Sequence, residues 1–363
     1  MAKVLLGMSG GLDSSVAALL LQQAGHEVIG MTIKTYNYDD ISGSNAANDT
    51  SCCSLDGIND ARRIAIKLGI PHYVSDMTEE FGGTIIDYFK DTYLEGKTPN
   101  PCVQCNREIK WAAMLRKADA LDCDYISMGH YVNLREENSR MVISKSLDMT
   151  KDQSYALWAV RNEHLRRTVF PLTNYTKKQI REIAYTHDLP VAGKKESYEI
   201  CFVQDNNYRR FLHDNVPNIS ERTPRGNFIL QNEIVGEHDG VPFYTIGQRK
   251  GLGLSIPSHP SPLYVTGLDI INNIVTLGDD EELFDSELTA SSVNMMKYAE
   301  LPSKGINVTA KIRYKDEGAK AAAFPYGDNR FRVIFEEPRR AITPGQSVVL
   351  YEGDDIVAGG IID

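Results

Sequence analysis

The first 35 residues constrain the fold most strongly, because they read as strand, turn, helix and strand in direct succession. Residues 3–8 form a short apolar run that ends at Ser9-Gly10-Gly11. Residues 13–24 carry apolar side chains at helical spacing, and residues 27–33 are again a continuous apolar run. A helix that joins two apolar strands is typical of a βαβ unit, in which the two strands are parallel.

The same alternation continues to residue 128 and predicts an α/β fold with a doubly wound parallel sheet. The expected helices are 55–68, 79–94 and 103–121, and the expected strands are 72–74 and 124–128. After residue 203 the pattern changes to short β-rich runs between Gly, Pro, Asn and Asp turns, which is typical of small barrels or sandwiches. These runs are 228–230, 242–246, 263–268, 274–277, 308–314, 330–335 and 347–351. We therefore expect three domains, at residues 1–206, 207–280 and 281–363.

Composition excludes several classes of protein. Hydrophobic residues are 42% and charged residues 24% of the chain, which is ordinary for a globular protein. No apolar run approaches the roughly 18 residues that a membrane span needs, and the N-terminus has no export signal. We therefore expect a cytoplasmic protein with reduced thiols. The net charge of −10 disfavours a protein that coats nucleic acid non-specifically.

The sequence Ser9-Gly10-Gly11-Leu12-Asp13-Ser14 lies between the first strand and the first helix. Glycines in this position let backbone N–H groups approach a polyphosphate, and the helix N-terminus adds partial positive charge. The Ser9 and Ser14 hydroxyls can donate to phosphate oxygens, while Asp13 can cap the helix or hold Mg²⁺. Because the Lys of a Walker A loop is absent, the sequence favours a nucleotide whose pyrophosphate is the leaving group.

The cysteines offer a second candidate centre. Cys102 and Cys105 form a C-x-x-C motif at the start of a predicted helix, where the helix dipole and nearby basic residues favour the thiolate. Cys201 lies in a strand-like run at 199–203. Buried structural thiols, a zinc site, thiol redox or sulfur-transfer chemistry, and a three-cysteine iron–sulfur cluster all remain possible for these three residues. We interpret Cys123 as a buried structural thiol and Cys52-Cys53 as bystanders.

Six motifs occur in an order that identifies a known family. They are SGGLDS at 9–14, PNPxxxCNxEIK at 99–110, GHY at 129–131, KDQSY at 151–155, SxEICF at 197–202 and YTIGQRKGLG at 244–253. Together they resemble the bacterial tRNA-specific 2-thiouridylases, from residue 3 to about residue 350. A lone SGGxDS loop is shared by many ATP pyrophosphatases, whereas the ordered set is more specific.

The resemblance implies an ATP-pyrophosphatase α/β domain, a central β-rich domain that contacts tRNA and a C-terminal β-barrel. It also implies a reaction in which ATP adenylates O2 of the wobble uridine and a cysteine persulfide then replaces that oxygen. An AMP ester departs far more easily than a carbonyl-type oxygen, so a sulfur nucleophile can attack C2. The implied partners are tRNAs with Lys, Glu and Gln anticodons and a sulfur-donor protein, either a cysteine desulfurase or a sulfur relay.

The resemblance also implies individual roles. Cys201 resembles the persulfide carrier, and Cys105 resembles the thiol that attacks the persulfide and leaves a transient Cys105–Cys201 disulfide. The residues that resemble ATP contacts are Gly7, Met8, Ser9, Gly10, Gly11, Leu12, Asp13, Ser14, Met31 and Gly129. The residues that resemble tRNA contacts are Asn100, Pro101, Cys102, His130, Lys151, Asp152, Gln153, Arg313, Tyr314 and Gln346.

One position departs from the family. Members commonly carry Asp three residues before the first catalytic cysteine, where this chain has Cys102. The Asp would interact with the target base and move protons, so the departure puts those two roles in doubt here. A third thiol beside Cys105 and Cys201 also keeps open an alternative in which these three cysteines hold a 4Fe–4S cluster whose open iron carries the sulfur.

A protein of net charge −10 must concentrate its positive charge to hold RNA, and residues 161–181 do so. Besides a tRNA sulfurtransferase, two other functions fit the residues. One is an amide-forming ATP pyrophosphatase that acts on a small molecule and needs no paired thiols. The other is a non-catalytic RNA-binding or sulfur-carrying module whose nucleotide loop only regulates it.

Overall fold

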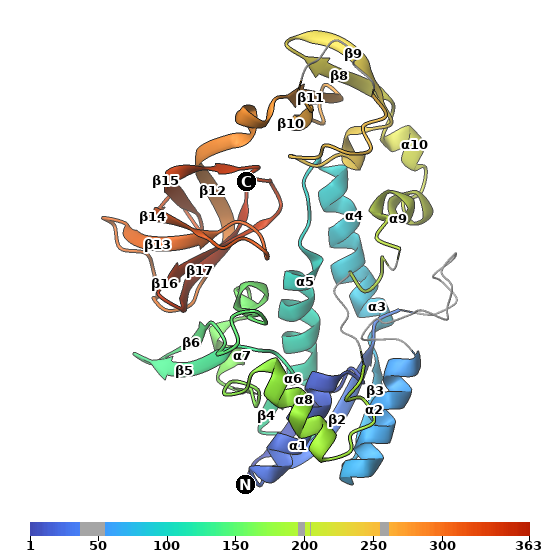
Figure 1. Cartoon of the computed structure of the whole chain (residues 1–363), viewed down its shortest axis with the longest axis vertical. Coiled ribbons are helices and arrows are strands. Elements are labelled where there is room, and N and C mark those ends of the chain that lie inside the picture. Colours follow the sequence, from blue (N-terminus) through green and yellow to red (C-terminus); the bar gives the residue numbers. More distant parts are fainter. Residues whose placement is uncertain (37–54, 195–199, 204, 255–260) are drawn as a thin grey trace. The chain divides into compact units, whose positions relative to one another are not determined.

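In the computed structural model, five parallel strands form a sheet with the order β3-β2-β1-β4-β7 (Figure 1). The strands are β1 (Lys3–Gly7), β2 (Glu27–Lys34), β3 (His72–Asp76), β4 (Tyr125–Ser127) and β7 (Thr168–Val169). The structure describes residues 1–36, 55–194, 200–203, 205–254 and 261–363. The prediction of a doubly wound parallel sheet is confirmed.

Helices α1 (Leu12–Gln23), α2 (Leu55–Leu68) and α8 (Lys177–Thr186) pack on one face of this sheet. Their apolar side chains form one core with alternate residues of the central strand, such as Val4 and Leu6, which are fully buried. Alternate residues of a strand point to opposite faces, so Leu5 lies on the other face, and it is also fully buried. Burial on both faces explains why β1 reads as a continuous apolar run.

The described residues divide into two compact units. The first comprises Met1–Ile86, Pro101–Asn207 and Asp354–Ile356, and the second Asp87–Asn100, Tyr208–Gly353 and Val357–Asp363. In the short piece Asp354–Ile356, Asp355 accepts two hydrogen bonds from Arg135 of the same unit, of 2.7 and 2.8 Å. The remaining elements of the first unit are α3 (Thr78–Phe81), η3 (Gly82–Ile86), α5 (Pro101–Gln104), η4 (Cys105–Ala113), α6 (Met114–Ala120), β5 (Asn133–Glu137), β6 (Arg140–Ser144), η5 (Ser154–Leu157) and α7 (Asn162–Leu165).

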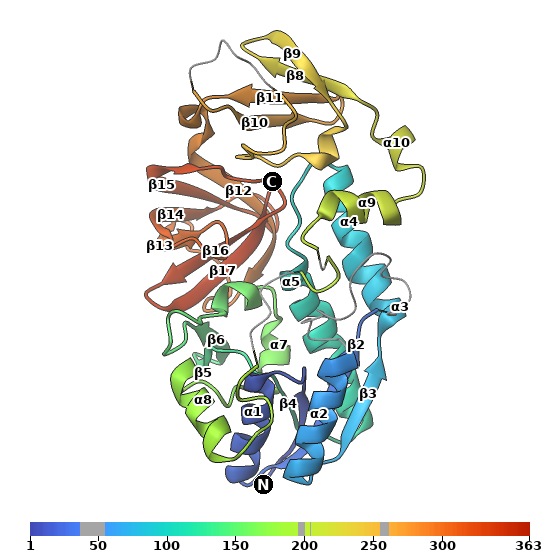
Figure 2. The ribbon, with the colours of Figure 1, turned by 45° about the vertical axis from the view of Figure 1, so that its right-hand side comes forward.

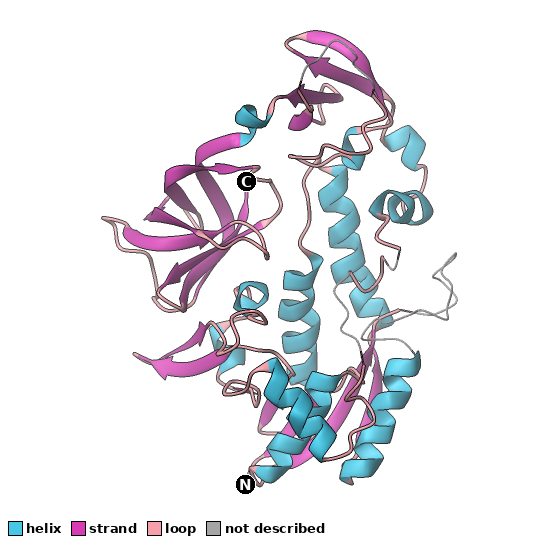
Figure 3. Cartoon of the chain, viewed as in Figure 1, coloured by secondary structure: helices cyan, strands magenta, loops and turns pink. Residues whose placement is uncertain are grey.

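The second unit is rich in strands (Figure 3). One sheet has the order β10-β11-β8-β9, from β8 (Gly226–Leu230), β9 (Glu233–His238), β10 (Tyr264–Asp269) and β11 (Ile274–Gly278). Its helical elements are α4 (Asp87–Leu94), α9 (Tyr208–Asn215), α10 (Ile219–Arg222), η6 (Val241–Phe243) and η7 (Asp280–Leu283). Helices α4 and α9 pack through aromatic side chains, with Tyr93 and Tyr208 stacked at 4.5 Å between ring centroids.

A six-stranded barrel ends the second unit (Figure 2). Its strands are β12 (Phe284–Met295), β13 (Ile306–Lys311), β14 (Ala319–Pro325), β15 (Phe331–Arg340), β16 (Ser347–Glu352) and β17 (Asp355–Ile362). The order is β12-β15-β14-β13-β16-β17, and pairing of β17 with β12 closes the ring. Fully buried Phe331 and Val333 of β15 lie in its core. The predicted β-rich region and C-terminal barrel are therefore confirmed, while the predicted domain boundaries at 206 and 280 stay predictions.

Some local predictions were wrong. Residues 242–246 are not a strand, because Pro242 lies in the 3₁₀ turn η6, and proline cannot donate to a sheet. Residues 200–203 form a turn rather than a strand. The loop at 35–54 and Cys52-Cys53 lie almost entirely outside the described residues. No helix in the described ranges is both long and apolar enough to cross a membrane.

Candidate active site

The turn between β1 and α1 is held by its own serine side chains. The backbone N–H of Ser9 donates to Ser14 Oγ at 3.2 Å, and the N–H of Gly11 donates to Ser9 Oγ at 3.3 Å. Helix α1 begins at Leu12, and its N-cap is Gly11, which provides no side-chain cap. Asp13 is therefore not the N-cap, which corrects one of its two expected roles. Uncapped N–H groups at this end are donors that a phosphate can use.

Two glycines bring neighbouring chains against this turn. Gly10 has φ +67°, and a Cβ at this position would lie 2.0 Å from the carbonyl oxygen of Gly57 in α2. A Cβ on Gly129, which follows β4, would lie 2.8 Å from the Ser14 nitrogen. Sheet order reverses between β1 and β4, and α/β proteins bind ligands at the carboxyl ends of the strands at such a point. Gly10 and Gly129 thus lie where a ligand would be expected in an α/β fold, and the contacts with ATP stay predictions.

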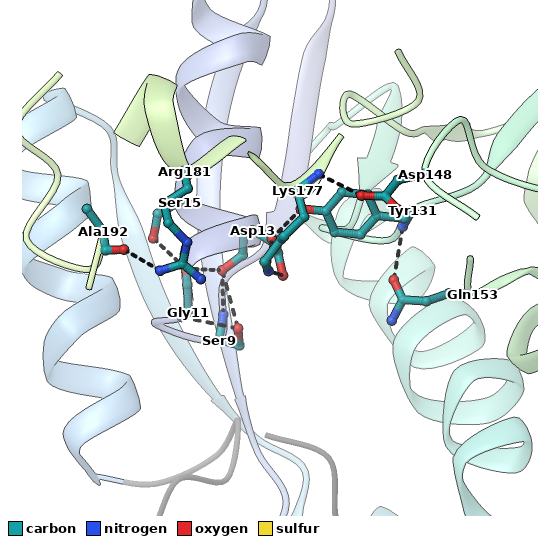
Figure 4. Close-up of polar contacts among 11 residues, drawn as sticks. Ser9, Gly11, Asp13, Ser15, Tyr131, Asp148, Gln153, Lys177, Arg181 and Ala192 are labelled. Carbon is teal, nitrogen blue, oxygen red and sulfur yellow. Dashed lines mark hydrogen bonds and ion pairs between the residues drawn. The ribbon is translucent and has the colours of Figure 1, made fainter. Parts of the chain in front are cut away.

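Asp13 is held by a lysine and a tyrosine from two other segments (Figure 4). Lys177 Nζ donates to the two carboxylate oxygens of Asp13 at 2.7 and 2.8 Å, and Tyr131 Oη donates to Asp13 Oδ1 at 2.6 Å. The Lys177 ammonium also lies 5.6 Å from the centre of the Tyr131 ring. Lys177 is only 9% exposed, so its charge faces the carboxylate in a region from which water is largely excluded.

Lys177 is a site residue that sequence reasoning missed. The sequence places it in the basic stretch at 161–181, as part of an RNA-binding surface. In the structure Thr176 caps α8 in a reciprocal capping box with Gln179, which makes Lys177 the first residue of the helix. The backbone N–H of Lys177 donates to Asp148 at 3.0 Å and fixes this helix end beside the turn. The fold therefore supplies, from a distant segment, the cation that the turn itself lacks.

The other basic residues of this stretch also have partners. Arg166 binds Glu136 at 2.9 Å, and Arg167 binds Asp119 at 2.5 Å. Arg181 donates to the carbonyl oxygen of Ala192 at 2.8 Å. Arg166 and Arg167 are thus paired with acidic residues of the first unit, whereas Arg181 keeps its charge beside a neutral carbonyl group.

The cysteines with chemical interest are accessible. Cys102 lies in α5 and is exposed, while Cys105, the first residue of the π-helical segment η4, and Cys201 are partly exposed. Cys123 is buried, and burial raises the pKa of its thiol, as expected for a structural cysteine. π-Helical segments occur frequently at functional sites. Both thiols of the expected catalytic pair therefore have the access that chemistry requires.

Hydrogen bonds tie the segment of Cys105 to the rest of the first unit. Next to Cys105, the Asn106 amide donates to the Ala156 carbonyl oxygen in η5 at 2.8 Å, just after Gln153. Gln153 in turn accepts a hydrogen bond from the Tyr131 N–H at 2.9 Å, so this path ends at Asp13.

Phe202 holds the segment of Cys201 against helix α3. The Phe202 ring packs edge-on against Phe81 of α3, with 5.7 Å between ring centroids, and α3 contacts η4. Cys105 and Cys201 thus belong to segments that pack around α3.

The metal alternatives can be compared with these positions. Among the described residues, which include Cys102, Cys105 and Cys201, no group of three or more His, Cys, Asp or Glu side chains is placed to hold a metal ion. The three cysteines do not fit a cluster in this arrangement, and we propose no step through one. Mg²⁺ takes one or two carboxylates together with substrate phosphates. Asp13 is the expected carboxylate, and it can hold Mg²⁺ only where Lys177 and Tyr131 release its oxygens.

Comparisons with known proteins decide the family. A model described as the tRNA methyl transferase HUP domain matches residues 2–205. Models of a tRNA methyl transferase PRC-barrel domain and an aminomethyltransferase beta-barrel domain match residues 211–279 and 285–362. The chain is 50% identical to the tRNA-specific 2-thiouridylase MnmA of Salinibacter ruber, over 99% of this chain and 94% of the relative. This chain belongs to the tRNA-specific 2-thiouridylase family.

A second relative agrees with this membership, and one solved structure shows a weaker likeness. The 2-thiouridylase of Cytophaga hutchinsonii is 49% identical over 99% of this chain and 97% of its own. A solved 4-thiouridine synthetase in complex with RNA and ATP is 15% identical over 61% of this chain and 52% of its own, with a TM-score of 0.38.

The tRNA contacts that the 2-thiouridylase resemblance implies fall into both units. In the first unit, Lys151–Gln153 form a turn in which Asp152 accepts hydrogen bonds from Ser146 and Ser154. The 3₁₀ turn η5 follows directly, at Ser154–Leu157. In this unit Pro101 is buried, whereas Cys102 is exposed.

In the second unit, Arg313 and Tyr314 are exposed, as a contact with RNA requires. Asn100, half-buried, precedes the start of α5. The Gln346 side-chain amide donates to the carbonyl oxygens of Thr98 and Pro99 at 3.1 and 3.0 Å. Gln346 therefore supports the segment that leads to Asn100. The resemblance alone does not reveal this role.

His130 lies in the core rather than on the surface. It is 8% exposed, and its ring lies beside Trp111 at 5.4 Å and Phe170 at 6.5 Å between centroids. Within the described residues its Nδ1 is a buried atom with no hydrogen-bond partner. Burial, aided by the charge of Lys110, lowers the pKa of His130 from 6.5 to about 3. This position suits a core histidine better than the expected contact with tRNA.

The buried imidazole predicts a dependence of stability on pH. The unfolded chain binds a proton at His130 below about pH 6.5, whereas the folded chain does so only near pH 3. Stability from this residue is therefore fully present above pH 6.5 and is lost as the pH falls. When the pH falls from 7 to 5, we expect the free energy of unfolding to decrease by about 2 kcal/mol less in H130F than in the wild type. Urea denaturation at the two pH values measures this difference. A variant at exposed His187, H187Q, is the control, and equal losses in H130F and the wild type would contradict the prediction.

Proposed function

We propose that this protein is the ATP-dependent enzyme that replaces O2 of the wobble uridine of tRNA with sulfur. The observation that carries the proposal is the cluster of Asp13, Lys177 and Tyr131 at the turn after β1, joined through Gln153 and Asn106 to the segment of Cys105. A nucleotide-activating centre and an accessible pair of thiols in one unit are what the reaction needs. Membership in the 2-thiouridylase family, at 50% identity over the whole chain, supports tRNA as the substrate.

In the first step the uridine O2 attacks the α-phosphorus of ATP, and pyrophosphate leaves. The N–H groups at the start of α1 would bind the phosphates, and Gly10, Gly11 and Gly129 leave room for their close approach. Lys177 would stabilise the charge that develops on the phosphates, because its ammonium lies at the same end of α1. Once Lys177 exchanges the Asp13 carboxylate for the phosphates, Asp13 would hold Mg²⁺, which supplies further neutralisation of the departing pyrophosphate.

In the second step sulfur replaces the activated oxygen. The terminal sulfur of a persulfide on Cys201 attacks C2 of the uridine, and AMP leaves with the former O2. The Cys105 thiolate then attacks the Cys201 sulfur, which breaks the S–S bond to the new thiocarbonyl and forms a Cys105–Cys201 disulfide. The transferred sulfur gains two electrons and the two thiols lose two, so a thiol reductant must reduce the disulfide before the next turnover.

Two partners complete the cycle. The proposed tRNA substrates carry Lys, Glu or Gln anticodons, and their target base must leave its stack to reach the site, at a cost of roughly a few kcal/mol. Arg313, Tyr314 and the turn at Lys151–Gln153 are the proposed contacts with tRNA in the two units. A sulfur-donor protein, a desulfurase or a relay, would load Cys201, and the chemistry places the enzyme in a reducing cytoplasm.

A reconstituted reaction tests this function. The purified protein is mixed with unmodified tRNA, Mg-ATP, a desulfurase with cysteine and a thiol reductant, and the nucleosides are analysed by mass spectrometry. The proposal predicts 2-thiouridine and one AMP per modified base. If AMP forms without 2-thiouridine, and a small amine is a better acceptor than tRNA, the protein is an amide-forming ligase that acts on a small molecule instead. If the D13N variant still forms 2-thiouridine, the nucleotide loop only regulates the protein and takes no part in the reaction.

A further inference from the structure

The loop between β13 and β14 carries Arg313 and Tyr314, and one carboxylate holds this loop together. Asp316 lies in the loop with a side chain that is only 5% exposed. Its Oδ2 accepts a hydrogen bond from the backbone N–H of Ile312 at 3.0 Å, and its Oδ1 accepts one from the N–H of Gly318 at 3.1 Å. The Asp316 N–H donates in turn to the Arg313 carbonyl oxygen at 3.1 Å. Both ends of the loop are therefore tied to a single residue.

An arginine of β15, the strand that pairs with β14, fixes this carboxylate. Arg339 Nη2 donates to Asp316 Oδ1 at 2.7 Å. Among the described residues, Arg339 Nε is a buried atom without a hydrogen-bond partner, so placing this guanidinium here has a desolvation cost. Desolvation offsets much of the attraction within such a pair, and its net contribution to stability is small. We therefore expect its main effect on the conformation of the loop rather than on the stability of the barrel.

The Arg313 side chain is oriented by the backbone next to Arg339. Its Nη2 donates to the carbonyl oxygen of Arg340 at 2.7 Å, and the Arg340 side chain is itself held by Asp280 at 2.7 and 2.9 Å. Because the acceptor is a neutral carbonyl group, the exposed Arg313 guanidinium keeps its positive charge. The loop thus presents an oriented cation next to the exposed ring of Tyr314. Cations bind RNA phosphates, and aromatic rings stack on unpaired bases.

We propose that Asp316 is a positioning residue for tRNA binding, which holds Arg313 and Tyr314 in the conformation that meets the RNA. The inference rests on the proposed function, because it takes these two residues as contacts with tRNA. A loop that is ordered before binding loses little conformational entropy when the RNA arrives, which is the advantage of such a device.

A purely local role for Asp316 would need fewer contacts. An Asp side chain that accepts a hydrogen bond from the N–H two residues on, as Asp316 does from Gly318, is common in turns. The bonds from Ile312 and Arg339 go beyond such a turn, because they tie the carboxylate to the start of the loop and to a separate strand.

The affinity of the full chain for an unmodified tRNA transcript with a Lys anticodon tests the inference. Fluorescence anisotropy measures the Kd over a series of salt concentrations, without ATP or sulfur donor. We expect D316N to raise the Kd about tenfold, because the asparagine NH₂ group faces a donor where the carboxylate accepted one, and the loop is released. The slope of log Kd against log salt should fall as it does in R313A, by roughly 0.7–0.9 for one phosphate contact. In the reconstituted reaction the KM for tRNA should rise while kcat is unchanged.

A second set of variants separates positioning from a merely structural role. A residue that acts only through Arg313 and Tyr314 has no effect once they are removed, so D316N should not weaken binding further in the R313A/Y314A background. If D316N weakens binding equally in that background and in the wild type, Asp316 only supports the barrel and the inference is wrong. If D316N does not fold, R339M removes the charge that holds Asp316 and must raise the Kd, while R339K must keep most of the affinity.

The matched control is E287Q. Glu287 of β12 binds Arg332, another arginine of β15. E287Q therefore removes the carboxylate from an ion pair of the same barrel that involves no residue of the loop. It should leave both the Kd for tRNA and its salt dependence unchanged.

Two outcomes separate the inference from the proposed function. If the wild type makes 2-thiouridine but D316N, or R313A/Y314A, binds tRNA with the wild-type Kd, the inference is wrong and the function stands. If D316N weakens tRNA binding through Arg313 and Tyr314 but no 2-thiouridine forms, the inference stands and the proposed function is wrong.

Discussion

Replacement of Cys201 by serine is expected to abolish 2-thiouridine formation, with a loss of at least about a thousandfold in the rate of thiolation. Serine cannot carry a persulfide, so no sulfur reaches C2. Cys105→Ser should cause a comparable loss under multiple turnover, because the bond between Cys201 and the transferred sulfur then has no internal thiol to break it. Both thiols are partly exposed, so neither substitution opens a cavity in the core.

The measurement is 2-thiouridine formation by mass spectrometry, with ATP binding followed separately. ATP should bind normally to both variants, because neither thiol lies in the turn between β1 and α1. The buried Cys123 provides the matched control, since C123A should retain thiolation. C102S should also retain most activity, because the proposed steps use only two thiols. Normal thiolation by C201S would contradict the mechanism, and inactivity of C102S together with bound iron would favour the cluster alternative.

Replacement of Lys177 by methionine is expected to slow AMP formation by about a hundredfold to a thousandfold, the usual cost of removing one preorganised charge partner of a developing anion. The ammonium is nearly buried and bonded to Asp13, and no lysine lies within the turn itself. Methionine fills a similar volume, so the loss should come from charge rather than from packing. Affinity for tRNA should change little.

The measurement is the rate of AMP formation that depends on tRNA. Lys178, the next residue of the same helix, gives a closely matched control, because its side chain is 87% exposed and lies 3.9 Å from Glu182. K178M should react at nearly the wild-type rate. If K177M and K178M were equally active, Lys177 would have no role in activating the nucleotide.

The parallel sheet could be predicted from sequence because apolar strands and periodic helices alternate regularly along the first 128 residues. Helix α2 was predicted with its observed bounds, residues 55–68, since its apolar residues recur with helical periodicity. Strand β7 was missed because it has only two residues, Thr168 and Val169, which is too short for any periodic signal. Residues 242–246 were mistaken for a strand because Phe243, Tyr244 and Ile246 are apolar, although Pro242, which lies in the 3₁₀ turn η6, argues against a sheet.

The candidate site could be predicted only in part, because some of its contacts join residues that lie far apart in the sequence. Ser9-Gly10-Gly11 is a local signal, and its place between strand and helix was visible in the sequence. Lys177 is 164 residues from its partner Asp13, and no local pattern encodes such a pairing. The capping box at Thr176 could have located the start of α8, but only the packing of α8 on α1 shows what its first residue meets.

Tracing the uridine O2 tests the proposed mechanism most directly. The reaction is run for a single turnover with tRNA labelled with ¹⁸O at O2 of the wobble uridine, and AMP is analysed by mass spectrometry. Attack of O2 on the α-phosphorus followed by displacement at C2 predicts one ¹⁸O atom in AMP for each 2-thiouridine formed. Unlabelled AMP with the ¹⁸O released in water would contradict activation of the uridine by adenylation.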